Sequence, residues 1–529
     1  MNRVEIFDST LRDGSQAEGI SFSVSDKLKI VKLLDDLFID YIEAGNPGSN
    51  PKDMLFFEEL KKVKLQNSKL VAFGSTRRYN TEAKDDSNLQ AILNSGVNTI
   101  CIFGKSWDFH VTDIIHTTLD KNLEMITDTI RYLTNKNREV FFDAEHFFDG
   151  YISNKEYALK TLDAAVKGGA KKLILCETRG GVLSTMVGKI TGDVVKRYPT
   201  IPIGIHTHND TGVAVASSLL AYEAGANHIQ GTLLGYGERC GNANLVEIIC
   251  NLKYKLNVEC LDDKAFETLT TIAHQVAEIS NVRIPKSAPF IGRSSFAHKG
   301  GMHIDGVRKN PISFEHMEPS LIGNTRRLLT SEVAGKALLL EKIKKHYPSF
   351  NSKDKRIYDL VNELKDLEAC GYQFEGAEAS FDLLIKRHIE SQKPYFRLNN
   401  YQTIGKEYYE VGLKNTPHTA MIKVEVAGKS AITAEEGAGP VNALDKALRK
   451  VLEPFYPILK GVYLSDYKVR VLDSLDATAS VVRVMIESTD GKKTWNTVGV
   501  NHDIIAASWQ ALSDSIAWYL EDSGVEPAK

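Results

Sequence analysis

Short apolar runs recur along the first 240 residues, and amphipathic stretches separate them. Runs rich in β-branched and aromatic side chains indicate strands, whereas residues 26–38, with apolar positions at helical spacing behind a Ser25 N-cap, indicate a helix. Eight such alternations predict a (β/α)8 TIM barrel, because a doubly wound sheet more often stops at five or six strands. The predicted strands are Val4–Phe7, Tyr41–Ala44, Lys69–Phe73, Thr99–Phe103, Glu139–Phe142, Lys172–Cys176, Pro202–Ile205 and His228–Leu233.

The pattern changes after residue 283, where prolines and a glycine interrupt a long amphipathic helix. Charged amphipathic helices follow, so residues 284–390 are expected to form a helical connector. From residue 391 to 529, alternating apolar and polar positions accompany further helices, which predicts a separate α+β domain. The helices expected beyond the barrel are 336–346, 357–369, 441–452 and 503–519, and the strands are 419–426, 469–472 and 480–488.

Composition narrows the class of protein. The 529 residues are 43% hydrophobic and 25% charged, which is typical of a globular chain with a sizeable core. The net charge of -3 gives no general attraction to nucleic acid or to an anionic membrane. Six cysteines without a Cys-x-x-Cys pair exclude a disulfide framework and a zinc ribbon. We find no signal peptide or membrane-spanning segment, and therefore expect a soluble cytoplasmic protein.

Polar side chains follow five of the predicted strands, at the end where barrel enzymes carry their active sites. His206 and His208 give the sharpest signal, because residues two apart on a strand share a face and both imidazoles can reach one cation. Asp13 is expected nearby, since strand eight closes beside strand one. Such ligands suit zinc, manganese, cobalt or magnesium. The simpler alternative is a pair of ordinary surface or core histidines.

Three further residues are candidates for handling charge and protons. Arg12 offers a permanently charged fork to an oxyanion, although an ion pair with Asp13 that merely ends the strand is the alternative. Glu145 follows an apolar strand and is a candidate general base, although a structural glutamate is at least as common. His303 shares a glycine-rich turn with His298, and surface histidines are the default in such a turn.

Three motifs carry a resemblance to a known family: Asp8-Ser-Thr-Leu-Arg-Asp-Gly-Ser-Gln16, Gly204-Ile-His-Thr-His-Asn-Asp210 and Gly237-Glu-Arg-Cys-Gly-Asn-Ala-Asn244. Together they resemble the metal-dependent acyl-transferring barrels of the isopropylmalate, homocitrate and citramalate synthase family. The stretch Ala144-Glu-His-Phe-Phe-Asp-Gly150 is similar to the citramalate branch, and Glu436-Gly-Ala-Gly-Pro-Val-Asn-Ala-Leu444 is similar to the family's C-terminal regulatory domain. The resemblance covers nearly the whole chain.

The resemblance implies a ligand set and substrate contacts. Asp13, His206 and His208 would bind a divalent metal, with Asn242 as a further ligand or close neighbour. The metal would chelate a 2-oxo acid through its keto and carboxylate oxygens, and Thr178 would contact that carboxylate.

The resemblance also implies a reaction. Arg12 would stabilise charge on the keto oxygen, while Glu145 and a partner-subunit histidine matching His303 would take a proton from the methyl group of acetyl-CoA. Condensation with pyruvate and thioester hydrolysis would then give citramalate and CoA, as a step of isoleucine biosynthesis. Residues 1–283 would be the catalytic barrel of a homodimer, and residues 391–529 would bind a regulatory amino acid, with isoleucine as the suggested effector.

Some positions depart from the family pattern, which opens alternatives. Glu177, Arg179 and Phe314 replace residues that are more usual there, and Asn46 stands where the citramalate branch usually has tryptophan. An added cation and a lost aromatic wall would favour a larger or more acidic 2-oxo acid than pyruvate. The alternatives are therefore an isopropylmalate synthase or another 2-oxo acid synthase, and, from another class, a catalytically weak regulatory or binding protein.

Overall fold

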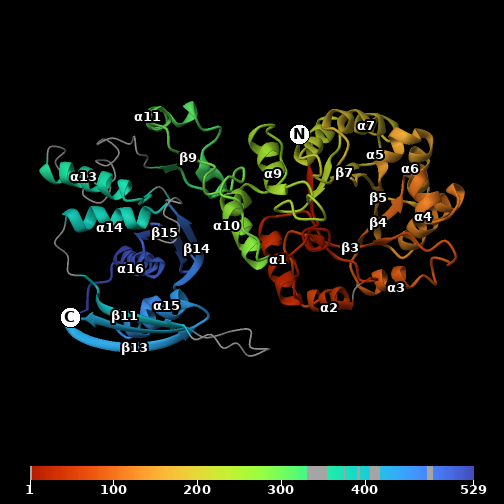
Figure 1. The fold of residues 1–529 in the computed structure, drawn as a ribbon. Helices are drawn as coiled ribbons and strands as arrows, with labels where there is room; N and C mark the ends of the chain where they lie inside the picture. Colours follow the sequence, from red (N-terminus) through yellow and green to blue (C-terminus); the bar gives the residue numbers. More distant parts are fainter. Residues whose placement is uncertain are drawn as a thin grey trace. The chain divides into compact units, whose positions relative to one another are not determined.

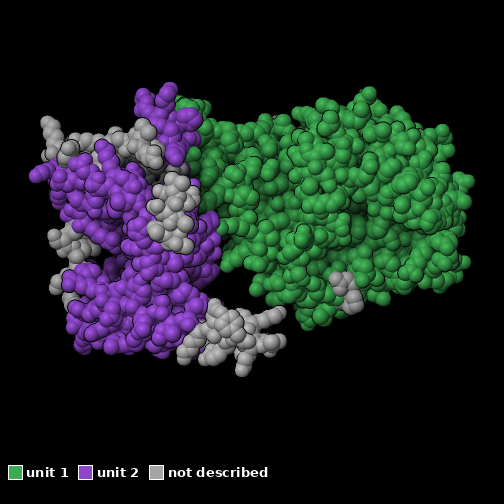
Figure 2. All heavy atoms as spheres, viewed as in Figure 1, with its two compact units in different colours: residues 1–297, 310–327 green, residues 298–309, 328–529 purple. Residues whose placement is uncertain are grey.

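A computed structural model describes residues 3–49, 51–329, 343, 354–374, 376–389, 394–405, 418–472 and 480–528. The chain forms two compact units, coloured separately in Figure 2. The first unit comprises residues 1–297 and 310–327, and the second comprises residues 298–309 and 328–529.

The first unit is built on a closed barrel of eight strands, which confirms the predicted (β/α)8 fold (Figure 1). Neighbouring strands are parallel, and β1 pairs with β8 with Ile6 opposite Ile229, which closes the barrel. All eight predicted strands are present, with ends moved by up to three residues. They are β1 (Glu5–Asp8), β2 (Tyr41–Gly45), β3 (Lys69–Ser75), β4 (Thr99–Lys105), β5 (Glu139–Glu145), β6 (Lys172–Glu177), β7 (Ile203–Thr207) and β8 (His228–Gly231).

Helices surround this barrel. They are α1 (Val24–Asp36), α2 (Pro51–Leu60), α3 (Ser87–Asn94), α4 (Leu119–Thr134), α5 (Phe147–Ser153), α6 (Lys155–Gly168), α7 (Ser184–Arg197), α8 (Ala214–Glu223), α9 (Leu245–Tyr254) and α10 (Asp263–Ile279). Short helical turns lie at Gly14–Gln16, His110–Ile114, Pro311–Ser313 and Pro319–Ile322, and two short strands are β9 (Ala297–His298) and β10 (Arg327–Leu328).

The N-cap of α1 is Ser23, so the Ser25 cap expected from the sequence is wrong. The Ser23 hydroxyl accepts from the backbone N–H of Asp26, and the Asp26 side chain accepts from the backbone N–H of Ser23, which completes a capping box. Both serines precede apolar residues at helical spacing, but only Ser23 has an acidic partner three residues later. Ser25 lies inside the first turn and is exposed.

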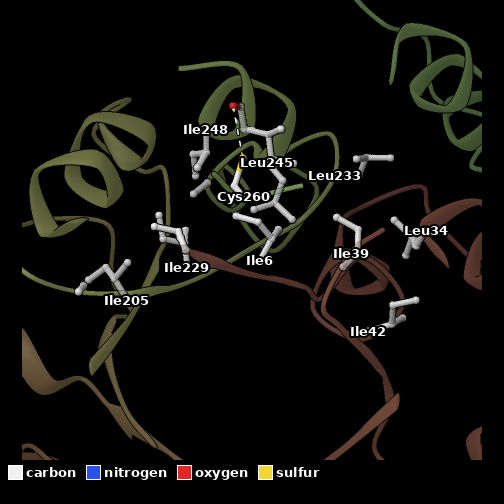
Figure 3. Packing of buried hydrophobic residues seen from close by; sticks show 14 of the residues in the cluster. Ile6, Leu34, Ile39, Ile42, Ile205, Ile229, Leu233, Leu245, Ile248 and Cys260 are labelled. Carbon is white, nitrogen blue, oxygen red and sulfur yellow. Dashed lines mark hydrogen bonds between the residues drawn. The ribbon is translucent and has the colours of Figure 1, made fainter. Parts of the chain in front are cut away.

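The main core lies between the barrel and its helices. Figure 3 shows Ile6 of β1 and Ile229 of β8 in this cluster together with Leu245 of α9. The same packing includes Cys260, whose thiol donates to the carbonyl of Ile249 at 3.9 Å. All six cysteines are unpaired, as expected from the absence of a disulfide framework.

The interior of the barrel near the amino ends of the strands holds a buried polar cluster. His228 is fully buried, and its Nδ1 lies 3.3 Å from Lys172 Nζ and 3.4 Å from Glu5 Oε2. The rings of Tyr41 and Phe141 lie 4.5 and 4.6 Å from the Lys172 ammonium. Burial, and then the charge of Lys172, lowers the pKa of His228 to about 4. The imidazole is therefore neutral in the folded barrel at physiological pH.

The second unit contains two sheets, each covered by a helix, which confirms the α+β class predicted for this part of the chain. In the antiparallel sheet β11-β12-β13, strand β12 packs against α15, and in the antiparallel sheet β14-β15-β16, strand β15 packs against α16. Strands β11, β13 and β16 were not predicted, and the expected helix 336–346 lies outside the described residues except for residue 343. The elements are α11 (Gly301–Lys309), α13 (Lys355–Ala369), α14 (Glu378–Ile389), β11 (Arg397–Gly405), β12 (His418–Val426), β13 (Lys429–Gly437), α15 (Pro440–Leu452), a helical turn at Pro457–Gly461, β14 (Tyr463–Val471), β15 (Val482–Thr489), β16 (Thr494–Asn501) and α16 (Ile504–Asp522).

None of the helices in the described part of the chain is long and apolar enough to cross a membrane.

Removing the α1 cap should destabilise the barrel. We expect Ser23→Ala to lower the free energy of unfolding by about 1 kcal/mol, because the N–H of Asp26 loses its acceptor. Ser25→Ala is the matched control and should change the stability by much less. Urea titrations that follow the barrel transition would measure both. An equal loss in both variants would contradict the cap assignment.

The buried His228 should make the barrel acid-sensitive. Its folded pKa is about 4, below the ordinary value of 6.5, so lowering the pH protonates the unfolded chain first and reduces stability as the pH falls through 6.5 toward 4. Between pH 8 and pH 5 this contribution amounts to about 2 kcal/mol. His228→Gln should therefore lose about 2 kcal/mol less than the parent chain over that interval in urea titrations. The same pH dependence in both proteins would contradict the buried neutral histidine.

Candidate active site

Asp13, His206 and His208 meet at the carboxyl ends of the barrel strands. Asp13 follows β1, while His206 and His208 lie at the end of β7, and only β8 separates those strands. The two imidazole Nε2 atoms are 3.4 Å apart, and Asp13 Oδ2 lies 3.3 Å from that of His206 and 3.9 Å from that of His208. All three side chains are buried. The structure thus brings together the three residues that the sequence suggested as metal ligands.

The charges of this group favour a cation between its members. Burial alone would raise the pKa of Asp13, but Arg12 and the histidines outweigh it and hold that pKa well below its usual range. Burial would lower the pKa of His206, yet Asp13 raises it. Burial and the charge of His206 lower the pKa of His208 to about 4, so its nitrogen is available as a ligand.

Asn242 supplies an independent test of whether these residues fit a metal. It forms an isolated backbone bridge with His208, and its Nδ2 donates to the carbonyl of Tyr236 at 3.0 Å. Its Oδ1 is buried and has no hydrogen-bond partner within the described residues. A buried amide oxygen without a hydrogen-bond donor lowers the stability of the folded protein unless an ion or a ligand interacts with its lone pairs. Two imidazole nitrogens and a carboxylate form a donor set that fits a divalent cation, and the amide oxygen of Asn242, which is bridged to His208 through the backbone, is the candidate further ligand.

Gln230 fixes the orientation of His206. Its Oε1 lies 2.9 Å from His206 Nδ1, while its Nε2 donates to Asp143 Oδ1 at 3.3 Å. Because the amide nitrogen faces a carboxylate, the amide oxygen accepts from the Nδ1–H of His206, and Nε2 is the ring atom directed at Asp13 and His208. Gln230 and Asp143 were missed as site residues by the sequence reasoning, although each is a polar residue inside a strand of apolar neighbours.

Arg12 is held in place by a second buried carboxylate. Its Nε donates to Glu43 Oε2 at 2.7 Å, its Nη1 lies 3.3 Å from Asp13 Oδ2, and its guanidinium stacks over Phe73 at 3.7 Å. Glu43 is fully buried and also accepts from the hydroxyl of Ser9. The sequence reasoning missed Glu43, although a glutamate within the apolar run Tyr41–Ala44 was a usable signal. The result is a rigid cation beside the group formed by Asp13, His206 and His208.

A cavity of about 280 Å³ opens beside Arg12. Its walls come from the segment after β1, from α1, from the segment that joins β2 to α2, from the start of α2, and from β3. The lining residues are Arg12, Ser15, Gln16, Ile20, Ser21, Phe22, Lys27, Asn46, Ser49, Lys52, Asp53 and Phe73. The cavity therefore presents amide, hydroxyl and ammonium groups next to the guanidinium of Arg12, which also contacts Asp13.

Glu145 and Thr178 lie at the ends of β5 and β6. Glu145 Oε2 is 2.5 Å from Lys105 Nζ, so the candidate base is part of an ion pair. Thr178 Oγ1 accepts from the backbone N–H of His146 at 2.9 Å, which leaves the threonine hydroxyl hydrogen free to be donated. That hydrogen is the group that a substrate carboxylate would accept.

His303 and Phe314 lie outside the barrel strands. His303 is on α11 of the second unit, and its role stays a prediction. Phe314 follows the helical turn Pro311–Ser313, and its side chain is largely exposed.

The departures at Arg179, Glu177 and Asn46 have local structural partners. Arg179 donates from Nε and Nη2 to Asp149 Oδ1 at 3.0 and 2.5 Å. Glu177 Oε1 accepts from the backbone N–H groups of Gly181 and Val182. The side-chain oxygen of Asn46 accepts a hydrogen bond from the backbone N–H of Gly48. The backbone N–H of Asn46 donates to the carboxylate of Asp53. Arg179 therefore adds no uncompensated charge to the barrel mouth.

Models of three families match this chain. The HMGL-like family matches residues 3–276, the homocitrate synthase post-HMGL domain-like family matches residues 290–371, and the LeuA allosteric (dimerisation) domain matches residues 375–520.

Full-length relatives are also found. The chain is 48% identical to the (R)-citramalate synthase of Aquifex aeolicus over 99% of both chains. It is 46% identical to the (R)-citramalate synthase of Geobacter sulfurreducens over 99% of this chain and 98% of the relative. Identity falls to 28% for a probable 2-isopropylmalate synthase of Methanopyrus kandleri, over 97% of each chain.

The orientation of His206 by Gln230 can be tested through metal affinity. Gln230→Met keeps a similar volume but removes the acceptor for His206 Nδ1–H, so we expect metal binding to weaken by roughly tenfold to a hundredfold. Calorimetric titration of metal-stripped protein with Mn²⁺ and Zn²⁺ measures this change. Gln90→Met, the same replacement on α3, is the control and should bind metal like the parent chain. Unaltered affinity in a folded Gln230→Met protein would contradict the assignment.

Proposed function

This chain belongs to the HMGL-like family and, within it, to the citramalate synthases, and from that premise we propose that it condenses acetyl-CoA with pyruvate to give citramalate and CoA. The observation that carries the proposal is 48% identity to a citramalate synthase over 99% of both chains, together with the ligand group at the barrel mouth. The reaction is a Claisen-type condensation followed by hydrolysis of the thioester. The enzyme is thus a metal-dependent acyltransferase.

Asp13, His206, His208 and Asn242 are the residues that would hold the metal, which is zinc, manganese, magnesium or cobalt. A divalent cation bound there supplies positive charge that polarises the keto group of the 2-oxo acid and orients its carboxylate. Arg12 has a fixed position beside the carboxylate of Asp13, so it can stabilise negative charge that develops on the keto oxygen.

Thr178 donates its hydroxyl hydrogen to the carboxylate of the 2-oxo acid in this proposal. Glu145 then takes a proton from the methyl group of acetyl-CoA, with His303 from the partner subunit of a homodimer as the second proton-handling group. A weakly acidic methyl group needs a base held at hydrogen-bonding distance, and a β-strand end can hold one rigidly.

The cavity beside Arg12 suits the arm of acetyl-CoA that carries the thioester. That arm is a chain of amides with a phosphate at its far end. Gln16 and Asn46 provide amide groups and Lys52 an ammonium group along the cavity wall. Because Arg12 lines this cavity and also contacts Asp13, the acetyl group would arrive next to the 2-oxo acid.

The second unit would provide dimerisation and control. Residues 375–520 match a model described as an allosteric (dimerisation) domain. Strand β14 exposes Tyr463, Tyr467, Val469 and Val471, and such apolar side chains suit a contact between two subunits. We propose that residues 1–283 form the catalytic barrel, 284–390 a connector, and 391–529 a domain that binds an amino-acid effector, with isoleucine as the candidate. The enzyme would then work in the cytoplasm and supply isoleucine biosynthesis under feedback control.

The proposed reaction predicts a substrate preference. With Mn²⁺ or Zn²⁺ added, the full chain should release CoA from acetyl-CoA fastest with pyruvate, among pyruvate, 2-oxoisovalerate, 2-oxoglutarate, oxaloacetate and glyoxylate. A thiol reagent that detects free CoA measures the rates. Preference for 2-oxoisovalerate would instead support the isopropylmalate synthase alternative, and no release with any acceptor would support a regulatory or binding protein.

A ligand variant and its control accompany this assay. His208→Ala should abolish both CoA release and stoichiometric metal binding, because it removes one of the two imidazole ligands. His116→Ala, on an exposed loop, should leave both unchanged. Full metal occupancy in His208→Ala would contradict the ligand role.

A further inference from the structure

His146 is a buried imidazole directly after Glu145, at the carboxyl end of β5. Its backbone has φ 58° and ψ 31°, in the left-handed region that residues other than glycine seldom adopt. Such conformations persist where the surroundings fix them, and they are frequent at functional sites. The ring of His146 lies 4.1 Å from that of His110 and 5.8 Å from that of Trp107, measured between centroids.

A carboxylate orients this imidazole. His146 Nδ1 lies 3.1 Å from Asp149 Oδ2, and Arg179 donates two hydrogen bonds to the other oxygen of Asp149. Burial would raise the pKa of Asp149, but His146 and Arg179 outweigh it and lower it, so the carboxylate is ionised. An ionised acceptor beside Nδ1 favours the tautomer with its hydrogen on Nδ1, so Nε2 is the ring atom that faces away from the carboxylate. Arg179, Asp149 and His146 therefore form a chain that orients the imidazole, with Nε2 as its basic atom.

The basic atom of this chain is available. His146 Nε2 has no hydrogen-bond partner among the described residues, and it is not enclosed in the way that His110 Nδ1 is. The backbone N–H of His146 donates to Thr178 Oγ1, so the backbone that carries this imidazole is linked to the residue proposed to bind the substrate carboxylate. His146 thus stands at the same strand ends as the proposed reaction site.

The proposed reaction needs a base twice. The first takes a proton from the acetyl methyl group, a role given above to Glu145. The second must act on the water that cleaves the thioester after condensation, and by then Glu145 has accepted a proton. A separate imidazole, already oriented by a carboxylate, satisfies that second requirement.

We propose that His146 is the general base that activates water for hydrolysis of the citramalyl thioester, with Asp149 and Arg179 as its positioning residues. This inference rests on the proposed condensation. Nε2 removes a proton from water as the water oxygen bonds to the thioester carbon. The carbon–sulfur bond then breaks, and the imidazolium returns its proton to the departing CoA sulfur. The acyl carbon gains hydroxyl and the sulfur gains hydrogen, so water is consumed and His146 is regenerated.

The test separates the two halves of the reaction. In His146→Gly the left-handed backbone remains unstrained, because glycine accepts this φ, while the imidazole is lost. The metal-loaded full chain is mixed with acetyl-CoA and pyruvate, quenched in acid, and analysed for citramalyl-CoA by mass spectrometry. We expect citramalyl-CoA to form and accumulate, with its hydrolysis slowed roughly a hundredfold or more. Added imidazole should restore part of the rate.

Two further variants make the result specific. His116→Gly is the matched control, because His116 also has a positive φ, of 51°, but lies on an exposed loop, and it should hydrolyse the thioester like the parent. Asp149→Asn should slow thioester hydrolysis by a smaller factor without slowing condensation. If His146→Gly does not fold, this variant tests the assignment, and an unchanged rate of hydrolysis in Asp149→Asn would contradict it.

The outcomes distinguish the two proposals. If the parent chain makes no citramalyl-CoA or citramalate from these substrates, the proposed function fails. If the parent does, and His146→Gly hydrolyses synthetic citramalyl-CoA at the parent rate, the His146 assignment alone is overturned. The assignment is also overturned if His146→Gly loses condensation and thioester hydrolysis to the same extent and added imidazole restores neither reaction.

Discussion

The buried carboxylate of Asp13 is the interaction on which the barrel mouth depends. A carboxylate removed from water is costly unless cations and hydrogen-bond donors surround it. Here Arg12 and the imidazoles of His206 and His208 converge on it, and burial is outweighed by their charge. That convergence requires β1 and β7 to lie on either side of β8, so barrel closure and the metal-binding geometry are one constraint.

The same rule extends to the residues behind the ligands. Glu43 holds Arg12, and Asp143 holds Gln230, which in turn orients His206. Burial raises the pKa of both Glu43 and Asp143, so neither carboxylate would be placed there without a partner to compensate. Arg12 and His206 are therefore each fixed by a buried polar side chain from a neighbouring strand, which keeps both groups in a defined position.

The sequence predicted the barrel and the meeting of Asp13 with His206 and His208, because hydrophobic periodicity and strand-end position report directly on both. It did not predict where strands stop. Strand β5 continues through Asp143 to Glu145, since polar residues that face the barrel interior can stay in the ladder after the apolar pattern has ended.

Groups that support the site were harder to predict. Glu43 and Gln230 are single polar residues in short strands, and their partners come from distant parts of the chain. The pairing register of the barrel strands decides which interior side chains lie at the same height and can contact each other, and the local sequence does not reveal this register. In the second unit, β13 was missed because its side chains alternate weakly between exposed and half-buried.

Charge pairing at the mouth changes what the departures from the family pattern imply. From the sequence, Arg179 looked like an added cation that would select a more acidic substrate. In the structure its guanidinium is bound by Asp149 and lies 5.1 Å from the ring centroid of Trp107, so its charge is already compensated. Asn46 keeps both its side chain and its backbone in local hydrogen bonds, and it shapes the cavity wall without adding charge. Neither departure therefore supplies an uncompensated charge that would select a more acidic 2-oxo acid than pyruvate.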